Sequence, residues 1–237
     1  MNSSIICNNE DVKSFIVAYS EVVTLLGAAP IGPHRIQSVF DLAPNLIAAD
    51  GGASLALAAG LVPDWIIGDL DSVDVAALSS VPHERILHVE EQNSTDFEKA
   101  LRHIEAPLIL AVGFSGGRVD HELAVYNALV RHESSPVIVL TDEDIVFQAP
   151  RSISLDLPVG SRVSLFPMGP VLGRSTGLKW PIEGLEFRPG GSIGTSNQVT
   201  GPVELSFESD QMLIILPRDA LFEVMSHFGV APRVRGK

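Results

Sequence analysis

The chain has 237 residues, enough to bury a substantial hydrophobic core in one large domain or two smaller ones. It carries 29 acidic and 16 basic side chains, and this balance argues against a nucleic-acid partner because phosphate backbones bind Lys and Arg patches. No segment has the roughly 20 apolar residues that span a bilayer, and the start of the chain lacks a targeting pattern. We therefore expect no membrane partner. The single cysteine, Cys7, is consistent with a reducing, cytoplasmic location.

Strands and helices are expected to alternate along the first part of the chain, after weakly patterned residues up to about Ser20. The expected strands are Val22–Leu26, Asn45–Ala49, Trp65–Ile67, Arg85–Val89, Leu108–Val112 and Val137–Thr141. The expected helices are Ile36–Leu42, Ala53–Ala59, Val73–Leu78, a helix capped by Thr95 that runs to about His103, and Val119–Arg131. Several strands are apolar throughout, which is typical of a parallel sheet covered on both faces. The pattern predicts an α/β domain with a Rossmann-like parallel sheet over residues 20–145.

The pattern changes from about Arg151, where Pro and Gly become frequent and helical periodicity ends. Short alternating runs at Arg162–Phe166, Val203–Phe207 and Met212–Leu216 are typical of strands. We therefore expect a second, all-β domain, a sandwich, over residues 150–220.

Polar clusters follow four of the expected strands at their carboxyl ends. They are Asp50-Gly51-Gly52, Asp69-Leu70-Asp71, Gln92–Asp96 and Gly113–His121. In an open parallel sheet, the ligand crevice lies outside the carboxyl ends of the strands. We therefore expect these clusters to lie at one edge and to form a ligand site.

Asp69 and Asp71 follow a short apolar strand at positions i and i+2, which places both carboxylates on one face, about 7 Å apart. Two hard oxygen ligands suit Mg²⁺, which proteins usually hold with carboxylates plus substrate phosphates, so a nucleotide is the first candidate ligand. Acids outnumber bases by 17 to 5 between Asp50 and Asp144, and a polyphosphate there would need a divalent metal for screening. The alternative is a polar turn that closes the strand.

The other clusters offer phosphate-binding groups. The glycine pairs Gly51-Gly52 and Gly116-Gly117 leave backbone N–H groups open to phosphate oxygens. Arg118 presents a planar fork for phosphate, and His121 is able to bond a phosphate or a neighbouring aspartate. Each cluster also has a purely structural alternative. The glycine pairs would form turns, Thr95 would cap a helix, Arg118 would be a solvated surface charge, and His121 would bond within the domain.

Together, these motifs resemble the thiamin pyrophosphokinase family, in family order and over roughly Leu25–Pro217. The matching segments are Ala49–Gly52, Pro63-Asp64 through Gly68–Ser72, Gln92 with Thr95-Asp96, Gly116–His121, Gly177–Pro181 and Thr195–Asn197. The resemblance implies transfer of a pyrophosphoryl group from ATP to the hydroxyethyl oxygen of thiamin, with Mg²⁺, giving thiamin diphosphate and AMP. It also implies a homodimer with shared active sites.

The resemblance also assigns roles by position. Asp69, Asp71 and Asp96 correspond to the catalytic and metal-binding carboxylates. The nucleotide-binding positions are Asp50, Gly51, Gly52, Gln92, Thr95, Gly116, Gly117, Arg118, Asp120 and His121. Trp180, Ser196 and Asn197 match the motifs associated with thiamin.

Two of these roles have physical arguments of their own. Asp96 or Asp71 would orient the attacking hydroxyl or accept its proton. Trp180 offers a ring face to the thiazolium cation of thiamin, and the alternative is a tryptophan of the β-domain core.

The chain departs from the family pattern at three places. It has Asn93 where a third acid is common and Ser54 where asparagine is common, and its first glycine-rich loop reads Gly27-Ala28-Ala29-Pro30. The first departure weakens a metal role at position 93, and the other two affect the expected nucleotide contacts.

Three other functions compete with this one. An aspartate-nucleophile phosphatase would use Asp69 to attack phosphorus, but it needs a lysine near the phosphate and a late acidic pair, and the expected β-rich second half argues against it. A nucleotide-dependent dehydrogenase would need a Gly-x-Gly-x-x-Gly motif after the first strand, where only Gly27-Ala28-Ala29 stands. A non-catalytic thiamin or nucleotide sensor would need fewer carboxylates beside a polyanion.

Overall fold

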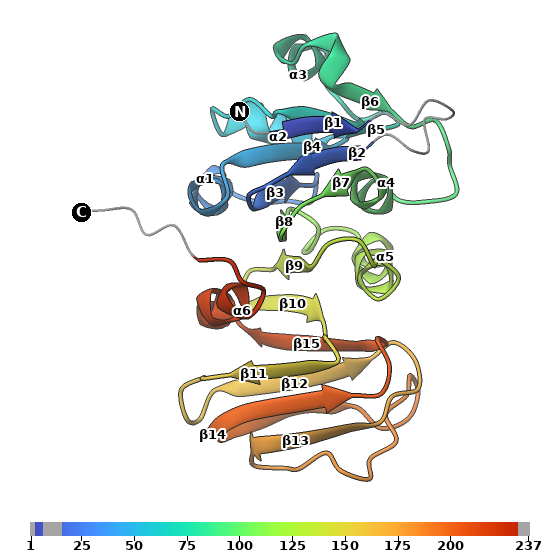
Figure 1. Ribbon diagram of the computed structural model, residues 1–237. Coiled ribbons are helices and arrows are strands. Elements are labelled where there is room, and N and C mark those ends of the chain that lie inside the picture. The colour runs from blue at the N-terminus through green and yellow to red at the C-terminus, as the bar shows by residue number, and fades with distance from the viewer. Residues whose placement is uncertain (1–2, 7–15, 232–237) are drawn as a thin grey trace, which may run out of the picture. The chain divides into compact units, whose positions relative to one another are not determined.

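A computed structural model describes residues 3–6 and 16–231 of the chain (Figure 1). Cys7, which was considered for its redox environment, lies outside these residues. The chain divides into two compact units. Among the described residues, the first contains those up to Ala128 and His132–Val139, and the second contains Leu129–Arg131 and 140–231.

The first unit is organised around a sheet of short apolar strands. These are β3 (Val23–Leu26), β4 (Asn45–Ala49), β5 (Trp65–Gly68), β6 (Ile86–His88), β8 (Ile109–Val112) and β9 (Val137–Leu140). Their order is β9-β8-β3-β4-β5-β6, and the pairs β3–β8, β3–β4, β4–β5 and β5–β6 are parallel. Every residue of β3, β5 and β8 is buried, as expected for strands covered on both faces.

Helices connect these strands where the sequence predicts them. They are α1 (Pro33–Leu42), α2 (Gly52–Ala58), α3 (Val75–Ser80), α4 (Asp96–Arg102) and α5 (Val119–Leu129), with a short 3₁₀ turn η2 (His83–Arg85). The predicted capping box of α4 is confirmed: the Thr95 hydroxyl accepts the Glu98 N–H, and the Glu98 carboxylate accepts the Thr95 N–H. Helix α3 begins two residues later than expected because Asp74, its N-cap, is extended.

A small additional sheet was not predicted. It consists of β1 (Ser3–Ile6), β2 (Ile16–Tyr19) and β7 (Ile104–Glu105), with β1–β2 antiparallel and β2–β7 parallel. The strands have two to four residues each, too few to establish a clear alternation in the sequence.

The second unit is rich in β-strands, as expected. Its strands are β10 (Asp144–Gln148), β11 (Ser152–Leu155), β12 (Arg162–Pro167), β13 (Gly173–Leu178), β14 (Gly194–Phe207) and β15 (Met212–Pro217). Strand β15 pairs antiparallel with β10 and β12. The long strand β14 changes partners along its length: its first residues pair with β12, and the rest pair with β11 and β13.

A helix that was not predicted follows the expected β-domain. A 3₁₀ turn, η3 (Arg218–Ala220), leads into helix α6 (Leu221–His227). Leu221, Val224 and Met225 are buried, and their spacing of three and four residues gives this short helix one apolar face. Among the described residues, no helix is long and apolar enough to cross a membrane.

Candidate active site

The four polar clusters lie at the carboxyl ends of parallel strands, as predicted. Asp50 follows β4, Asp69 follows β5, residues 92–96 connect β6 to α4, and residues 113–118 connect β8 to α5. Because these strands run in parallel register, their carboxyl ends meet at one edge of the sheet. The topology therefore gathers side chains that are far apart in the sequence.

Three carboxylates converge at this edge: one oxygen each from Asp50, Asp69 and Asp71 lies within 4.8 Å of the others. Asp50 is only 3% exposed, and its Oδ1 has no hydrogen-bond partner. Burial raises the pKa of Asp50, and the charge of Asp96, followed by those of Asp69 and Asp71, raises it further. An unpartnered buried carboxylate oxygen beside two other carboxylates fits a hard divalent cation such as Mg²⁺.

The backbone at the triad is unusual for non-glycine residues. Asp50 and Leu70 have φ angles of 44° and 66°, in the left-handed region. Gly68 permits the close approach of the two segments, since a Cβ built on it would lie 2.8 Å from the Asp50 Cβ. Such conformations cost about 1–3 kcal/mol each and are concentrated at functional sites.

Lys99 is the site residue that the sequence analysis did not identify. Its Nζ lies 2.6 Å from Asp69 Oδ2 and 3.2 Å from Asp96 Oδ1, and the residue is 2% exposed. The hydrogen bond from Lys99 is the main cause of the lowered pKa of Asp69, and Gln92 also donates to Asp69 Oδ2, at 3.2 Å. The signal in the sequence was the spacing: Lys99 follows Asp96 by three residues on a capped helix.

The position of Asp96 differs from the expected ligand set. Asp96 was expected beside Asp69 and Asp71 as a metal ligand, whereas the convergent group contains Asp50 instead. Asp96 lies in the first turn of α4, and its Oδ1 accepts a hydrogen bond from Lys99 Nζ at 3.2 Å.

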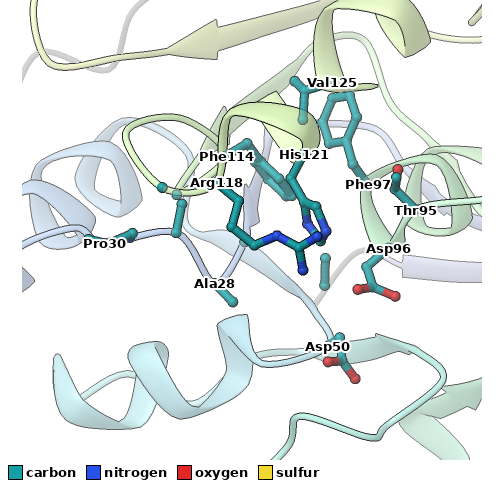
Figure 2. A pocket seen from close by; sticks show the side chains of 15 residues that line it. Ala28, Pro30, Asp50, Thr95, Asp96, Phe97, Phe114, Arg118, His121 and Val125 are labelled. Carbon is teal, nitrogen blue, oxygen red and sulfur yellow. The ribbon is translucent and has the colours of Figure 1, made fainter. Parts of the chain in front are cut away.

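A cavity of about 490 Å³ opens beside these carboxylates (Figure 2). Arg118 and His121 extend into it from the start of α5, opposite Asp50 and Asp96 (Figure 2). Its lining residues are Gly27, Ala28, Ala29, Pro30, Ala49, Asp50, Thr95, Asp96, Phe97, Gly113, Phe114, Gly117, Arg118, His121 and Val125. The cavity therefore joins acidic, basic and apolar side chains.

Two glycines permit the close approach of the loops beneath the cavity. A Cβ on Gly27 would lie 2.5 Å from the Gly113 carbonyl oxygen, and one on Gly113 would lie 2.6 Å from the Gly27 carbonyl oxygen. The Ala29 N–H also donates to the Gly113 carbonyl oxygen at 2.8 Å. The loop Gly27-Ala28-Ala29-Pro30, whose sequence differs from the family pattern, is thus part of the cavity wall.

Several predicted nucleotide-binding residues lie in the site but support other residues. Asp120 binds the Arg118 guanidinium with both carboxylate oxygens, at 2.6 and 3.1 Å, and holds this exposed arginine. The Gly116 N–H donates to Glu122 at 3.0 Å. Gly51 and Gly52 are not among the lining residues; a Cβ on Gly52 would lie 2.1 Å from the Leu26 carbonyl oxygen, so this glycine permits the packing of α2.

The departures at Asn93 and Ser54 have local structural roles. The Asn93 N–H donates to the Glu91 carboxylate at 2.8 Å, within the loop before α4. Ser54 Oγ accepts the Asp74 N–H at 3.3 Å, at the start of α3.

The second unit brings Trp180, Ser196 and Asn197 together. Trp180 is 54% exposed, so the alternative interpretation of a core tryptophan is wrong. Asn197 is 7% exposed, and its amide bonds the backbone N–H and carbonyl of Trp180. Ser196 is exposed with φ of 61°, and its N–H donates to Ser164 Oγ at 2.9 Å. Lys179 Nζ lies 4.8 Å from the centroid of the indole ring.

The first unit has the features of a nucleotide-handling α/β domain: parallel strands, convergent carboxylates and a cavity with a basic rim at the strand ends. Two family models match the chain: residues 36–140 match the thiamin pyrophosphokinase catalytic domain, and residues 140–213 match the thiamin pyrophosphokinase vitamin B1 binding domain. The chain therefore belongs to the thiamin pyrophosphokinase family.

Individual relatives agree with this assignment. The chain is 30% identical to thiamine pyrophosphokinase 2 of Arabidopsis thaliana over 171 residues, 64% of each chain. It is also 30% identical to thiamine pyrophosphokinase 1 of Oryza sativa subsp. japonica over 201 residues, 76% of this chain and 75% of the relative. The fold resembles the solved thiamin pyrophosphokinase from Candida albicans, with a TM-score of 0.69, 18% identity, and coverage of 92% of this chain and 99% of the other.

Proposed function

We propose that this chain transfers a pyrophosphoryl group from ATP to the hydroxyethyl oxygen of thiamin, giving thiamin diphosphate and AMP. The observation that carries the proposal is the convergence of Asp50, Asp69 and Asp71 oxygens within 4.8 Å, beside a cavity of about 490 Å³. The match of both parts of the chain to thiamin pyrophosphokinase family models supports it.

Mg²⁺ is the proposed cofactor, held by Asp69 and Asp71 together with Asp50. When bound, the ion supplies positive charge that neutralises the polyphosphate, which is the main requirement of phosphoryl-type transfer. Asp96 lines the cavity and is the proposed group that orients the thiamin hydroxyl or takes its proton, with Asp71 as the second candidate.

Arg118, His121 and Thr95 line the cavity and are the proposed contacts to the nucleotide. Arg118 is already held by Asp120 in a bidentate pair, so its guanidinium is oriented before a phosphate binds. Gly117 also lines the cavity and is a further proposed contact to the nucleotide. We assign supporting roles to Gly51, Gly52, Gln92, Gly116 and Asp120, which shape the loops or hold the side chains that bind.

Trp180 is the proposed platform for the thiazolium ring. The Lys179 ammonium at 4.8 Å illustrates that this indole accepts a cation. We assign Asn197 a positioning role because its amide is occupied by the Trp180 backbone. Ser196, which is exposed beside Asn197, is the proposed polar contact to thiamin.

Further parts of the proposal concern organisation. They are a Rossmann-like nucleotide-binding domain over residues 20–145, a β-sandwich thiamin-binding domain over 150–220, a cytoplasmic location, and a homodimer with shared active sites. The dimer has a direct test at a thiamin concentration well below KM: mixing inactive Asp71→Asn protomers with impaired Trp180→Ala protomers should give more activity than the two variants give separately if each site draws on both chains. No recovery after verified subunit exchange would exclude shared sites.

The decisive experiment incubates the protein with thiamin, ATP and Mg²⁺ and separates the products by chromatography. AMP and thiamin diphosphate should form in equal amounts. Release of free phosphate would instead support the phosphatase alternative. Lys99 lies beside Asp69, as the phosphatase alternative would require. The match to both thiamin pyrophosphokinase family models argues against that alternative. Binding of both substrates without turnover would support a sensor.

A further inference from the structure

Lys99 has an environment that stability alone does not explain. Its ammonium is almost fully removed from water, on the buried face of α4 between Asp69 and Asp96. Burying a charge costs several kcal/mol before its partners compensate for it. Well-packed apolar residues of similar size often give equal or greater stability at such positions. A buried lysine beside carboxylates therefore suggests a role in the chemistry of the site.

The charges at the strand ends indicate what that role is. Asp50, Asp69, Asp71 and Asp96 bring four carboxylates to this edge, and the raised pKa of Asp50 reflects burial and the other three charges. Lys99 contacts two of the four and supplies one internal positive charge. The cluster therefore retains three formal negative charges when all four acids are ionised.

The hydrogen bonds divide the cluster into a closed side and an open side. On the closed side, Asp69 Oδ2 accepts hydrogen bonds from Lys99 at 2.6 Å and Gln92 at 3.2 Å. On the open side, Asp50 Oδ1 is buried without a partner. A cation at Asp69 Oδ2 would therefore compete with an ammonium, but it would meet no such competitor at Asp50 Oδ1.

We infer that Lys99 is a positioning residue that acts as an internal counter-cation: it holds Asp69 and Asp96 in place and weakens the binding of a divalent ion in the absence of nucleotide. The inference rests on the proposed function because it concerns the metal site of that reaction. Its consequence is that the ion binds tightly only together with the nucleotide's phosphates, which bring additional oxygen ligands. Lys99 thus favours the metal–nucleotide complex over the bare ion.

The test measures Mn²⁺ binding to the nucleotide-free protein by titration calorimetry and by electron paramagnetic resonance of the unbound ion. Lys99→Met removes the ammonium but keeps an unbranched side chain. It should bind Mn²⁺ at least about 10-fold more tightly than the wild type, since a unit charge a few ångströms from the ion has been removed. Lys99→Arg, which keeps the charge, should stay close to the wild type. Lys179→Met is the matched control outside the cluster.

Unchanged or weaker Mn²⁺ binding by folded Lys99→Met would overturn the inference. The inference would also be overturned if neither the wild type nor Lys99→Met bound Mn²⁺. If Lys99→Met does not fold, the comparison moves to Asp96→Asn with and without Lys99→Met, because the neutral amide relieves repulsion in the cluster. The added Lys99→Met should again tighten binding, and no tightening would overturn the inference. A purely structural lysine would not increase metal affinity when removed.

This readout is separate from the proposed activity. Tighter Mn²⁺ binding in a protein that makes no thiamin diphosphate would support the counter-cation role and reject the proposed function. If the wild type forms thiamin diphosphate but Lys99→Met gains no Mn²⁺ affinity, the proposed function is supported and the counter-cation role is rejected.

Discussion

The side-chain amide of Asn197 holds the backbone of Trp180 at both of its polar groups. Asn197 Oδ1 accepts the Trp180 N–H at 3.1 Å, and Nδ2 donates to the Trp180 carbonyl at 2.6 Å. Oδ1 also accepts the Gln198 N–H at 2.8 Å. A buried amide on one strand thereby fixes an exposed indole that follows the neighbouring strand.

This arrangement predicts different effects for two substitutions. Trp180→Ala should raise the KM for thiamin, or lower kcat/KM, by about 10-fold, with the KM for ATP nearly constant and little change in Tm. Asn197→Ala should impair thiamin use in the same direction and also lower the free energy of unfolding by about 1–3 kcal/mol, because backbone groups lose their partners. Thr200→Ala, an exposed position on the same strand, is the control. Equal stability of Asn197→Ala and wild type would contradict the positioning role.

Asp71→Asn should nearly abolish turnover and leave the fold intact. Asp71 is exposed at the strand end, and its Oδ1 accepts the Ser72 hydroxyl at 2.7 Å, a contact that asparagine is able to keep. The change removes a metal-ligand charge and little packing. Steady-state kinetics at saturating Mg²⁺ check this, with Asp74→Asn as the near-silent control. Equal losses in both variants would show a nonspecific effect.

Metal removal should separate activity from stability. EDTA is expected to stop the reaction and to leave Tm almost unchanged, since the carboxylates serve the substrate complex.

Asp50→Asn should raise Tm in EDTA by roughly 2 °C or more, because it removes a buried charge that burial and three neighbouring acids disfavour. It should also lose activity. Calorimetric scans check both expectations, and a large drop in Tm on adding EDTA to the wild type would indicate a structural ion.

Gly27→Ala should destabilise the protein by at least about 1–3 kcal/mol. The new Cβ would lie 2.5 Å from the Gly113 carbonyl oxygen and 2.5 Å from the Phe114 ring, beneath the cavity. Gly32→Ala is the matched control: its φ is −75°, and nothing lies within 4 Å of the added Cβ. Urea unfolding of both variants measures the difference. Similar midpoints would mean that the two loops separate more easily than their geometry implies.

The contribution of His132 to the free energy of unfolding should fall as pH drops below about 6.5. Burial lowers the pKa of His132, and its Nε2 accepts the Ser135 N–H at 3.3 Å, which requires an unprotonated nitrogen. The unfolded state therefore takes up a proton at a higher pH than the folded state, and the unfolding free energy decreases between the unfolded-state and folded-state pKa values.

The His132 prediction is checked by measuring the unfolding free energy between pH 7.5 and pH 5.5. His132→Gln should reduce the slope. Burial also lowers the pKa of His227, so that residue contributes in the same direction and part of the slope should remain. An unchanged slope in His132→Gln would contradict the prediction.

Most of the first unit was predictable because its strands are short apolar runs separated by clear helix signals. The placement of Asp50, Asp69 and the loop before α4 at one edge followed from the parallel order alone. The participation of Lys99 was not predicted, because a lysine in a helix is usually exposed and its burial depends on how α4 packs against the sheet. The helix α6 was missed for a different reason: its seven residues are too few for an apolar face to stand out in the sequence.

The roles of Asn197 and Asp120 were also beyond the sequence. Both residues were expected to contact ligands, and the structure shows the protein groups that they bind: Asn197 the Trp180 backbone and Asp120 the Arg118 guanidinium. A motif identifies the residues near a site, but the partner of each polar atom depends on distances of a few tenths of an ångström.

The pairing of β14 has a consequence for synthesis on the ribosome. Strands β11 and β13 have β14 as their only strand partner among the described strands, and Ser152 at the start of β11 pairs with Ser206 near the end of β14. Neither strand can therefore complete its pairing until the end of β14, Ser206 and Phe207, has left the exit tunnel. A nascent chain stalled before that point exposes strand edges of the kind that aggregate or bind chaperones.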